Sequence, residues 1–218
     1  MFLIRKEEMV EMIDFFVKGG IIIYVILVVS ITGTTIFFKK LFELSALKRD
    51  FRKKISEVKS LAATSRLRAL RQYCYSQEDP LSSVMLKAID SIEAGNFGSF
   101  KMILPQILDE EIDKLYSGVE AISLTANSSP LLGLLGTITG LIKIFNVVGQ
   151  GSGSSYYSKL SIGIMEALYT TIAGLAAAIL LNVLYWFVVR KIEVFSSKFK
   201  DEVYILINSM GAFNEKEE

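Results

Sequence analysis

The chain has 218 residues, of which 51% are hydrophobic, and this is too apolar for an average soluble domain. Its net charge is +1, it contains no histidine, and Cys74 is its only cysteine. The commonest metal ligand and general base is therefore absent, and neither an intrachain disulfide nor a cysteine-based zinc site can form, so we expect no enzyme, no metal and no cofactor.

Three uncharged runs, 19–38, 121–142 and 167–189, are long enough to cross a hydrocarbon core of about 30 Å, which takes about 20 helical residues. We assign transmembrane helices to 19–38, 121–145 and 160–189. The preceding segment, 1–18, carries mixed charges and no cleavage site, so we expect a short N-terminal helix and a first span that stays in place as an anchor.

The polar region between the first two spans, residues 39–120, reads as helical because apolar residues recur at three- and four-residue steps. One helix is expected to continue out of the first span, a second to cover 81–93, and a third to cover 100–120. A helix and tail, 190–218, follow the last span. The expected fold class is an all-α integral membrane protein whose three transmembrane helices extend into a cytoplasmic helical bundle.

Positive charge indicates the orientation. Lysine and arginine crowd into 39–120 and follow the third span, whereas the connection from 143 to 165 holds only Lys143 and Lys159. Positive residues are retained on the cytoplasmic side, so this clustering reflects topology and not nucleic-acid binding. We expect the N-terminus and the turn at 146–159 outside, in the periplasm, and the C-terminus inside.

The third span contains one acidic residue, Glu166, about 9 Å from the start of the helix at 1.5 Å per residue. Small and polar residues share one face of this helix, and bulky residues share the other. Small residues let helices approach closely, so we expect the small face, with Ala167, Gly174 and Ala178, to meet protein or line a pore. The bulky face is expected to meet lipid.

The second span is sorted in the same way. Its small face carries Ser129, Pro130, Gly133, Gly136, Thr137 and Gly140. An acid inside a span costs about 2.5–3.5 kcal/mol on insertion scales, so Glu166 should be protonated, paired or hydrated. Hydroxyl groups can hold the water that reaches it. The predicted proton pathway is therefore Glu166, Thr137, Thr171 and Thr170. The alternative is that Glu166 caps the membrane edge and that the small residues serve only packing.

Two stretches resemble the MotA/TolQ/ExbB proton-channel family, and specifically its TolQ/ExbB branch. They are SPLLGLLGTITG at 129–140 and IGIMEALYTTIAGLAAAI at 162–179, and a weaker match is VKGG at 17–20. Three spans, not four, argue against the MotA branch. Leu180 stands where the family often has proline, which predicts a straighter lower helix.

The resemblance implies that Glu166, Thr137 and Thr171 line a channel. It also implies a homopentamer in the bacterial inner membrane around a single-span ExbD/TolR-like partner, whose membrane aspartate carries the proton, together with a TonB/TolA-like protein. Protons are the expected ion and sodium is the alternative.

The implied function is a proton-channel, or stator, subunit of a motor that energises an envelope process such as TonB-dependent import or Tol-type envelope maintenance. The alternative function is a non-conducting membrane scaffold that assembles a transport complex. A scaffold would tolerate Thr137→Val and Glu166→Gln but not Gly136→Leu.

Overall fold

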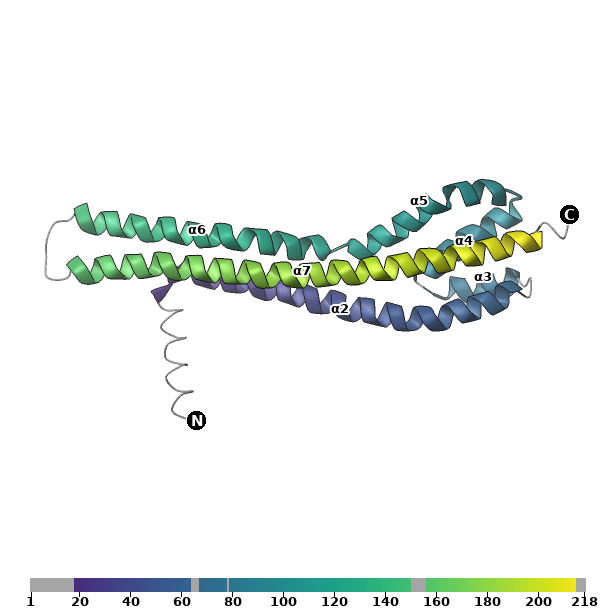
Figure 1. Cartoon of the computed structure of the whole chain (residues 1–218), viewed down its shortest axis with the longest axis horizontal. Coiled ribbons are helices and arrows are strands. Elements are labelled where there is room, and N and C mark those ends of the chain that lie inside the picture. Colours follow the sequence, from purple (N-terminus) through teal and green to yellow (C-terminus); the bar gives the residue numbers. More distant parts are fainter. Residues whose placement is uncertain (1–17, 64–66, 78, 150–155, 215–218) are drawn as a thin grey trace, which may run out of the picture. The chain divides into compact units, whose positions relative to one another are not determined.

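A computed structural model of the chain describes residues 18–63, 67–77, 79–149 and 156–214, and the secondary structure within them is helical throughout (Figure 1). The helices are α2 (Gly20–Ala63), α3 (Leu67–Tyr75), α4 (Pro80–Glu93), α5 (Phe97–Tyr116), α6 (Val119–Gly149) and α7 (Tyr156–Asn214). The predicted all-α fold class is confirmed. The helix expected over 1–18 lies almost wholly outside the described residues, as does the middle of the turn expected at 146–159.

Three helices, α2, α6 and α7, are long and apolar enough to cross a membrane. Large apolar side chains are exposed along all three of them, which is the surface that lipid or another protein would cover. Examples are Val28 on α2, Leu131 on α6 and Ile179 on α7. The chain is therefore a multi-pass membrane protein with three candidate spans.

The first and last of these helices are much longer than a span requires. Helix α2 has 44 residues and α7 has 59, against about 20 that cross a hydrocarbon core. Each of them joins an apolar segment to a charged one without a break, so the helix that leaves the first span continues as the sequence predicts.

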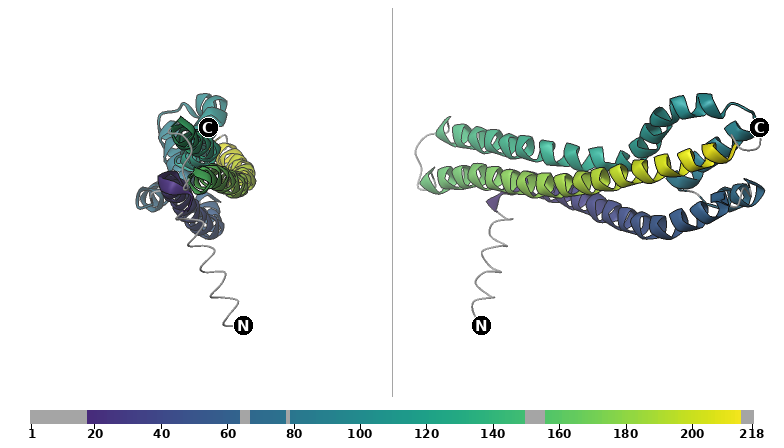
Figure 2. Two further views of the ribbon diagram at one scale, coloured as in Figure 1. Left: turned by 90° about the vertical axis from the view of Figure 1, so that its left-hand side faces the viewer. Right: turned by 45° about the vertical axis from the view of Figure 1, so that its right-hand side comes forward.

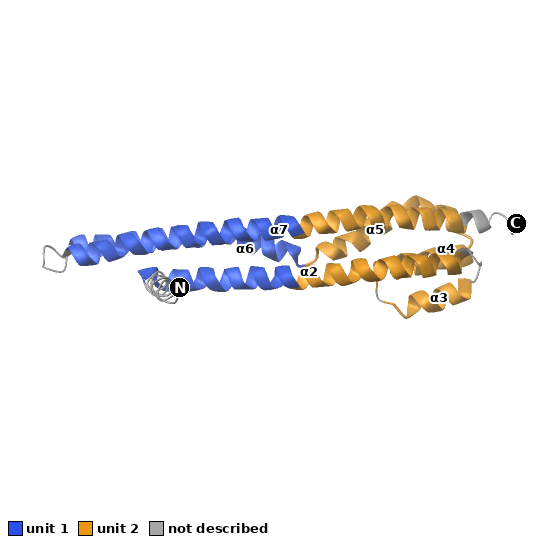
Figure 3. Ribbon diagram, turned by 60° about the horizontal axis from the view of Figure 1, so that its bottom comes forward, with its two compact units in different colours: residues 1–38, 118–187 blue, residues 39–117, 188–218 orange. Residues whose placement is uncertain are grey.

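The chain divides into two compact units (Figure 3). Unit 1 comprises residues 1–38 and 118–187, and unit 2 comprises 39–117 and 188–218. The chain passes between the units three times, twice within the continuous helices α2 and α7. The third connection, from α5 to α6, is not helical. Helix α5 ends at Tyr116, and Gly118 has φ +80°, a left-handed conformation that glycine adopts without a steric penalty. The helix expected over 100–120 therefore stops short, because this backbone conformation ends it.

Unit 2 is a helical bundle with a hydrophobic core. Its fully buried members include Leu70, Val84, Met85, Ala88, Ile89, Leu108, Val203 and Leu206. Helix α4 begins where Asp79 accepts a hydrogen bond from the backbone N–H of Ser82 at 3.0 Å, and Pro80 occupies its first turn. Gly95, with φ +69°, follows its end. The helix predicted over 81–93 is confirmed.

Several buried polar groups inside unit 2 are paired. Lys54 contacts Asp79 at 2.5 Å, and the buried carboxylate of Glu111 accepts hydrogen bonds from Ser83 and Lys114, both at 2.7 Å. Burial raises the pKa of Cys74 to about 11. This thiol lies in the core as a small hydrophobic group, which leaves no reactive cysteine in the unit.

Candidate functional site

Helix α6 and the first half of α7 lie side by side in unit 1 (Figures 1 and 2), and glycines bring them together. A Cβ atom added at Gly174 would lie 2.6 Å from the carbonyl oxygen of Ser129, and one at Gly140 would lie 2.8 Å from that of Gly163. A Cβ at Gly136 would overlap the side chain of Thr170. The two helices therefore meet at backbone distance along a line we call the α6–α7 seam.

Most of the residues predicted for helix packing contact the opposite helix at this seam, and nearly all of the predicted set is buried. Those that are buried are Ser129, Gly133, Gly136, Gly140, Ala167, Gly174 and Ala178, and Pro130 is half-buried. The bulky residues on the opposite faces are exposed: Leu131, Leu135 and Ile138 on α6, and Leu168, Ile172 and Ile179 on α7. The sorting by size in the sequence thus corresponds to sorting by burial in the fold.

Glu166 lies at the end of the seam near the C-terminus of α6, which we call the head of the seam. Its side chain is buried, and only 5% of the residue is exposed. Lys143, on α6, donates hydrogen bonds to both carboxylate oxygens of Glu166, each at 2.6 Å. Glu166 is therefore held in an ion pair, and its carboxylate is shielded from solvent. Of the three environments expected for an acid in a span, the structure has the paired one.

Helix α2 begins at the same carboxylate. Gly20 has φ +66°, and a Cβ atom added there would lie 2.9 Å from the carboxyl carbon of Glu166 and would overlap one of its oxygens. The space beside Glu166 exists because Gly20 has no side chain. The start of a helix also carries a partial positive charge, which favours an anion nearby. All three candidate spans thus meet at Glu166.

A pair of hydroxyl groups joins the two helices further along the seam. The Oγ1 atoms of Thr137 and Thr171 are 2.6 Å apart, and each hydroxyl also lies within hydrogen-bond reach of a carbonyl on its own helix. Thr170 is fully buried, and its hydroxyl donates to the backbone carbonyl oxygen of Glu166 at 3.0 Å. Thr137 and Thr171 therefore bridge the helices, whereas Thr170 supports the backbone at the acid.

Sequence reasoning missed two members of this site, Lys143 and Gly20. It counted Lys143 only as a charge in the outer connection. In an antiparallel pair of helices, each step along one is matched by a step back along the other. Lys143 lies six residues beyond Thr137 and Glu166 lies five residues before Thr171, so pairing the threonines predicts that the lysine faces the acid. No comparable signal in the sequence identifies the contact of Gly20.

This arrangement suits the handling of a charge or a proton. A carboxylate, an ammonium group and hydroxyl groups all exchange protons or hold water by hydrogen bonding. Over the parts of the chain that the structure describes, no cluster of three or more Cys, Asp or Glu residues is placed to hold a metal ion. The side chains at the seam are therefore ones that can exchange a proton or hold water.

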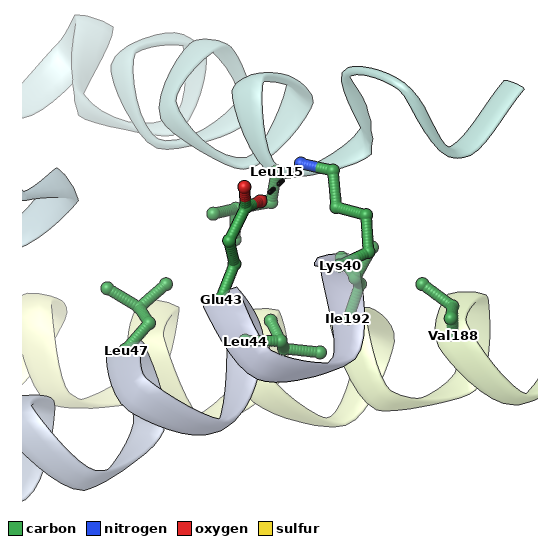
Figure 4. A pocket seen from close by; sticks show the side chains of 7 residues that line it. All are labelled: Lys40, Glu43, Leu44, Leu47, Leu115, Val188 and Ile192. Carbon is green, nitrogen blue, oxygen red and sulfur yellow. Dashed lines mark ion pairs between the residues drawn. The ribbon is translucent and has the colours of Figure 1, made fainter. Parts of the chain in front are cut away.

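A hollow in unit 2 is a weaker candidate for a functional site. Figure 4 shows it between α2, α5 and α7, with apolar walls formed by Leu44, Leu47, Leu115, Val188 and Ile192. The ion pair of Lys40 and Glu43, 3.2 Å apart, lies beside these walls. Lys40 and Glu43 form an ordinary i,i+3 ion pair on one helix, and because their charges balance each other they form no reactive site.

The three candidate spans enclose a buried acid and a pair of hydroxyl groups between them, which is a membrane protein with polar groups packed among its apolar helices. Residues 76–201, more than half of the chain, match the MotA/TolQ/ExbB proton channel family. The chain belongs to this family, whose members are channel proteins and not enzymes.

Relatives named ExbB support the ExbB branch. The ExbB-like 1 biopolymer transport protein of Synechocystis is 28% identical over 171 residues, which cover 78% of this chain and 67% of that protein. The biopolymer transport protein ExbB of Helicobacter pylori is 34% identical over 119 residues, 55% of this chain and 70% of that one. The solved structure of C. jejuni MotAB shares 17% identity at a TM-score of 0.49, over 90% of this chain and 78% of that one. The chain thus spans about two thirds of the length of these two ExbB-named relatives.

Proposed function

We propose that this chain is the proton-channel, or stator, subunit of an ExbB/TolQ-type inner-membrane motor. In this proposal, proton flow energises an envelope process such as TonB-dependent import or Tol-type envelope maintenance. The observation that carries the proposal is the buried carboxylate of Glu166 on an apolar helix, at the head of a seam of hydroxyl groups. Ionisable groups inside a span are costly and mark ion pathways, and membership of a proton channel family agrees with that interpretation.

The proposed path runs along the α6–α7 seam. A proton that reaches Glu166 passes the hydroxyl pair of Thr137 and Thr171, about 7.5 Å further along α7 at 1.5 Å per residue. Each charge that crosses the membrane supplies about 2.3 kcal/mol per 100 mV, which is enough to bias a packed helical bundle between two arrangements. The N-terminus and the turn between α6 and α7 lie outside in this proposal, and unit 2 lies inside.

The rest of the machine comes from other chains. We propose that copies of this chain form a homopentamer and that a single-span ExbD/TolR-like partner supplies a second membrane acid, with a TonB/TolA-like protein receiving the output. The broad exposed apolar faces of α6 and α7 support additional protein contacts within the membrane. Purification of the complex from the membrane, followed by mass measurement of the intact assembly, tests the partner and the stoichiometry together.

The function is tested by proton flux in liposomes that contain the complex with its partner. We expect Glu166→Gln to abolish flux while the complex still assembles, and Thr137→Val and Thr171→Val to reduce it at least tenfold. Glu193→Gln is the matched control for the acid, because Glu193 is an exposed residue on the same helix. Thr139→Val is the control for the hydroxyls, since the Thr139 hydroxyl bonds only the Gly136 carbonyl of its own helix at 2.9 Å. Full flux in Glu166→Gln would refute the proposal.

A non-conducting scaffold is the second candidate, and the saturated pairing of Glu166 favours it. An acid that both accepts from Lys143 and packs on Gly20 has the features of a structural group that fixes three helices. A scaffold predicts that Thr137→Val and Glu166→Gln keep activity, whereas Gly136→Leu, which collides with Thr170, breaks assembly. The same three variants therefore separate the two functions.

A further inference from the structure

The ion pair at the head of the seam is asymmetric. The side chain of Glu166 is 7% exposed and is confined by the start of α2 at Gly20, whereas the side chain of Lys143 is 57% exposed. A lysine ammonium sits on a flexible four-carbon stem. The ammonium can therefore swing out of the pair, but the carboxylate has no room to follow it.

Charge balance then limits what happens at Glu166. Removing one partner of a buried ion pair leaves an uncompensated charge, which is strongly unfavourable and which a carboxylate avoids by taking up a proton. The lysines near this end of the three helices are Lys18 before α2, Lys143 on α6 and Lys159 on α7. Lys143 is the cation that contacts both carboxylate oxygens. A proton and the Lys143 ammonium are thus alternative counter-charges for one carboxylate.

We propose that Lys143 controls proton occupancy of Glu166 by exchange: the carboxylate takes up a proton as the ammonium withdraws, and gives it up as the ammonium returns. The step is balanced: a hydronium ion gives up one O–H bond and becomes water as the carboxylate gains one, and the transferred proton replaces the single positive charge that departs. When the ammonium returns, the carboxyl O–H bond breaks and the proton passes back to water. Lys143 is in this sense a positioning residue and not part of the path itself. The inference deepens the proposed function and rests on it for its role in transport, but the exchange can be measured without any flux.

The test uses dicyclohexylcarbodiimide, which modifies membrane-embedded carboxylic acids in their protonated form. The full chain in lipid bilayers is treated at pH 7, and mass spectrometry of its peptides measures the modification of Glu166. We expect slow labelling in the wild-type chain and labelling at least about tenfold faster in Lys143→Met, the ratio that corresponds to about 1.4 kcal/mol of lost pairing. Lys143→Arg keeps the charge and should restore slow labelling, which a purely structural role for the lysine stem would not explain.

Matched variants decide what a change in labelling means. Lys18→Met and Lys159→Met remove the other two lysines and should leave Glu166 slowly labelled. Fast labelling of wild-type Glu166, equal rates in wild type and Lys143→Met, or an effect of Lys18→Met as large as that of Lys143→Met would each overturn the proposal. If Lys143→Met does not fold, the labelling rate of Glu166 in Lys143→Gln is compared with the wild-type rate instead. Loss of flux in Glu166→Gln with no effect of Lys143 on labelling would leave the proposed function standing and this inference refuted.

Discussion

Gly20→Ala is the substitution with the sharpest expected effect on the geometry at Glu166. Two costs add at this position. A left-handed backbone conformation costs a residue other than glycine about 1–2 kcal/mol. A methyl group 2.9 Å from the carboxyl carbon of Glu166, and closer to an oxygen, costs about 1–3 kcal/mol more as overpacking unless the acid is displaced from Lys143. We therefore expect a loss of about 2–5 kcal/mol of stability.

A second glycine separates these two costs. Gly95 has nearly the same backbone conformation, φ +69° against +66°, but a Cβ atom there would meet nothing within 4 Å. Gly95→Ala should therefore cost only the backbone part. The collision itself is isolated by a double-mutant cycle in unit 1, in which Glu166→Ala removes the carboxyl group that the new methyl meets. Thermal unfolding of the chain in detergent measures all of these variants.

The cycle can fail in a clear way. If Gly20→Ala costs as much in the Glu166→Ala background as in the wild-type chain, then α2 does not begin against the carboxylate and the meeting of three helices at Glu166 is wrong. The carbodiimide test gives an independent check, because a displaced and unpaired Glu166 in Gly20→Ala should also be labelled faster.

Three further sets of experiments test the seam and unit 2. Gly136→Ala should lower the unfolding temperature and weaken the association of α6 with α7, because the added methyl group overlaps Thr170. Gly149→Ala is the control and should have no such effect, since a Cβ atom there meets nothing within 4 Å. Equal melting curves for the two variants would contradict the close packing at the seam. Asp79→Ala should cost about 1–2 kcal/mol by removing the cap of α4 and the partner of Lys54, with the exposed Asp113→Ala as control, both measured by denaturant unfolding. Cys74 should resist alkylation at pH 8 until the chain unfolds, because a thiol with a pKa of about 11 is almost wholly protonated there. For the same reason the stability of unit 2 should fall as the pH rises from about 8.5, where an unfolded cysteine ionises, towards 11, and a flat profile would contradict the buried position.

The sequence was a good guide to the faces of single helices. A hydrophobic period of 3.6 residues shows which side of a helix is buried, and it sorted the glycines and serine of α6 from the leucines opposite them. Helix boundaries with their own chemistry, such as Asp79 and Pro80 at the start of α4, were equally legible. These features depend only on residues close together in the chain.

Features that depend on the register between helices were harder to predict. The periodicity of α6 places Lys143 near its outer end but does not say which residue of α7 lies opposite it. The approach of Gly20 to Glu166 joins residues far apart in the chain, and no local pattern records it. Gly118 was passed over because a single glycine inside a helical pattern is tolerated in many helices, and only the positive φ shows that this one ends α5.

The break at Gly118 makes the two sides of the seam mechanically unequal. Helix α7, which bears Glu166, passes from unit 1 into unit 2 as one uninterrupted helix, while α6, which bears Lys143, starts from a glycine joint. A change of φ and ψ at Gly118 alters the direction of α6 relative to α5 without breaking a helical hydrogen bond, whereas the same change of direction within α7 would bend a continuous hydrogen-bonded helix. The more flexibly attached helix, α6, thus carries the ammonium group of the ion pair, and the continuous helix, α7, carries the acid.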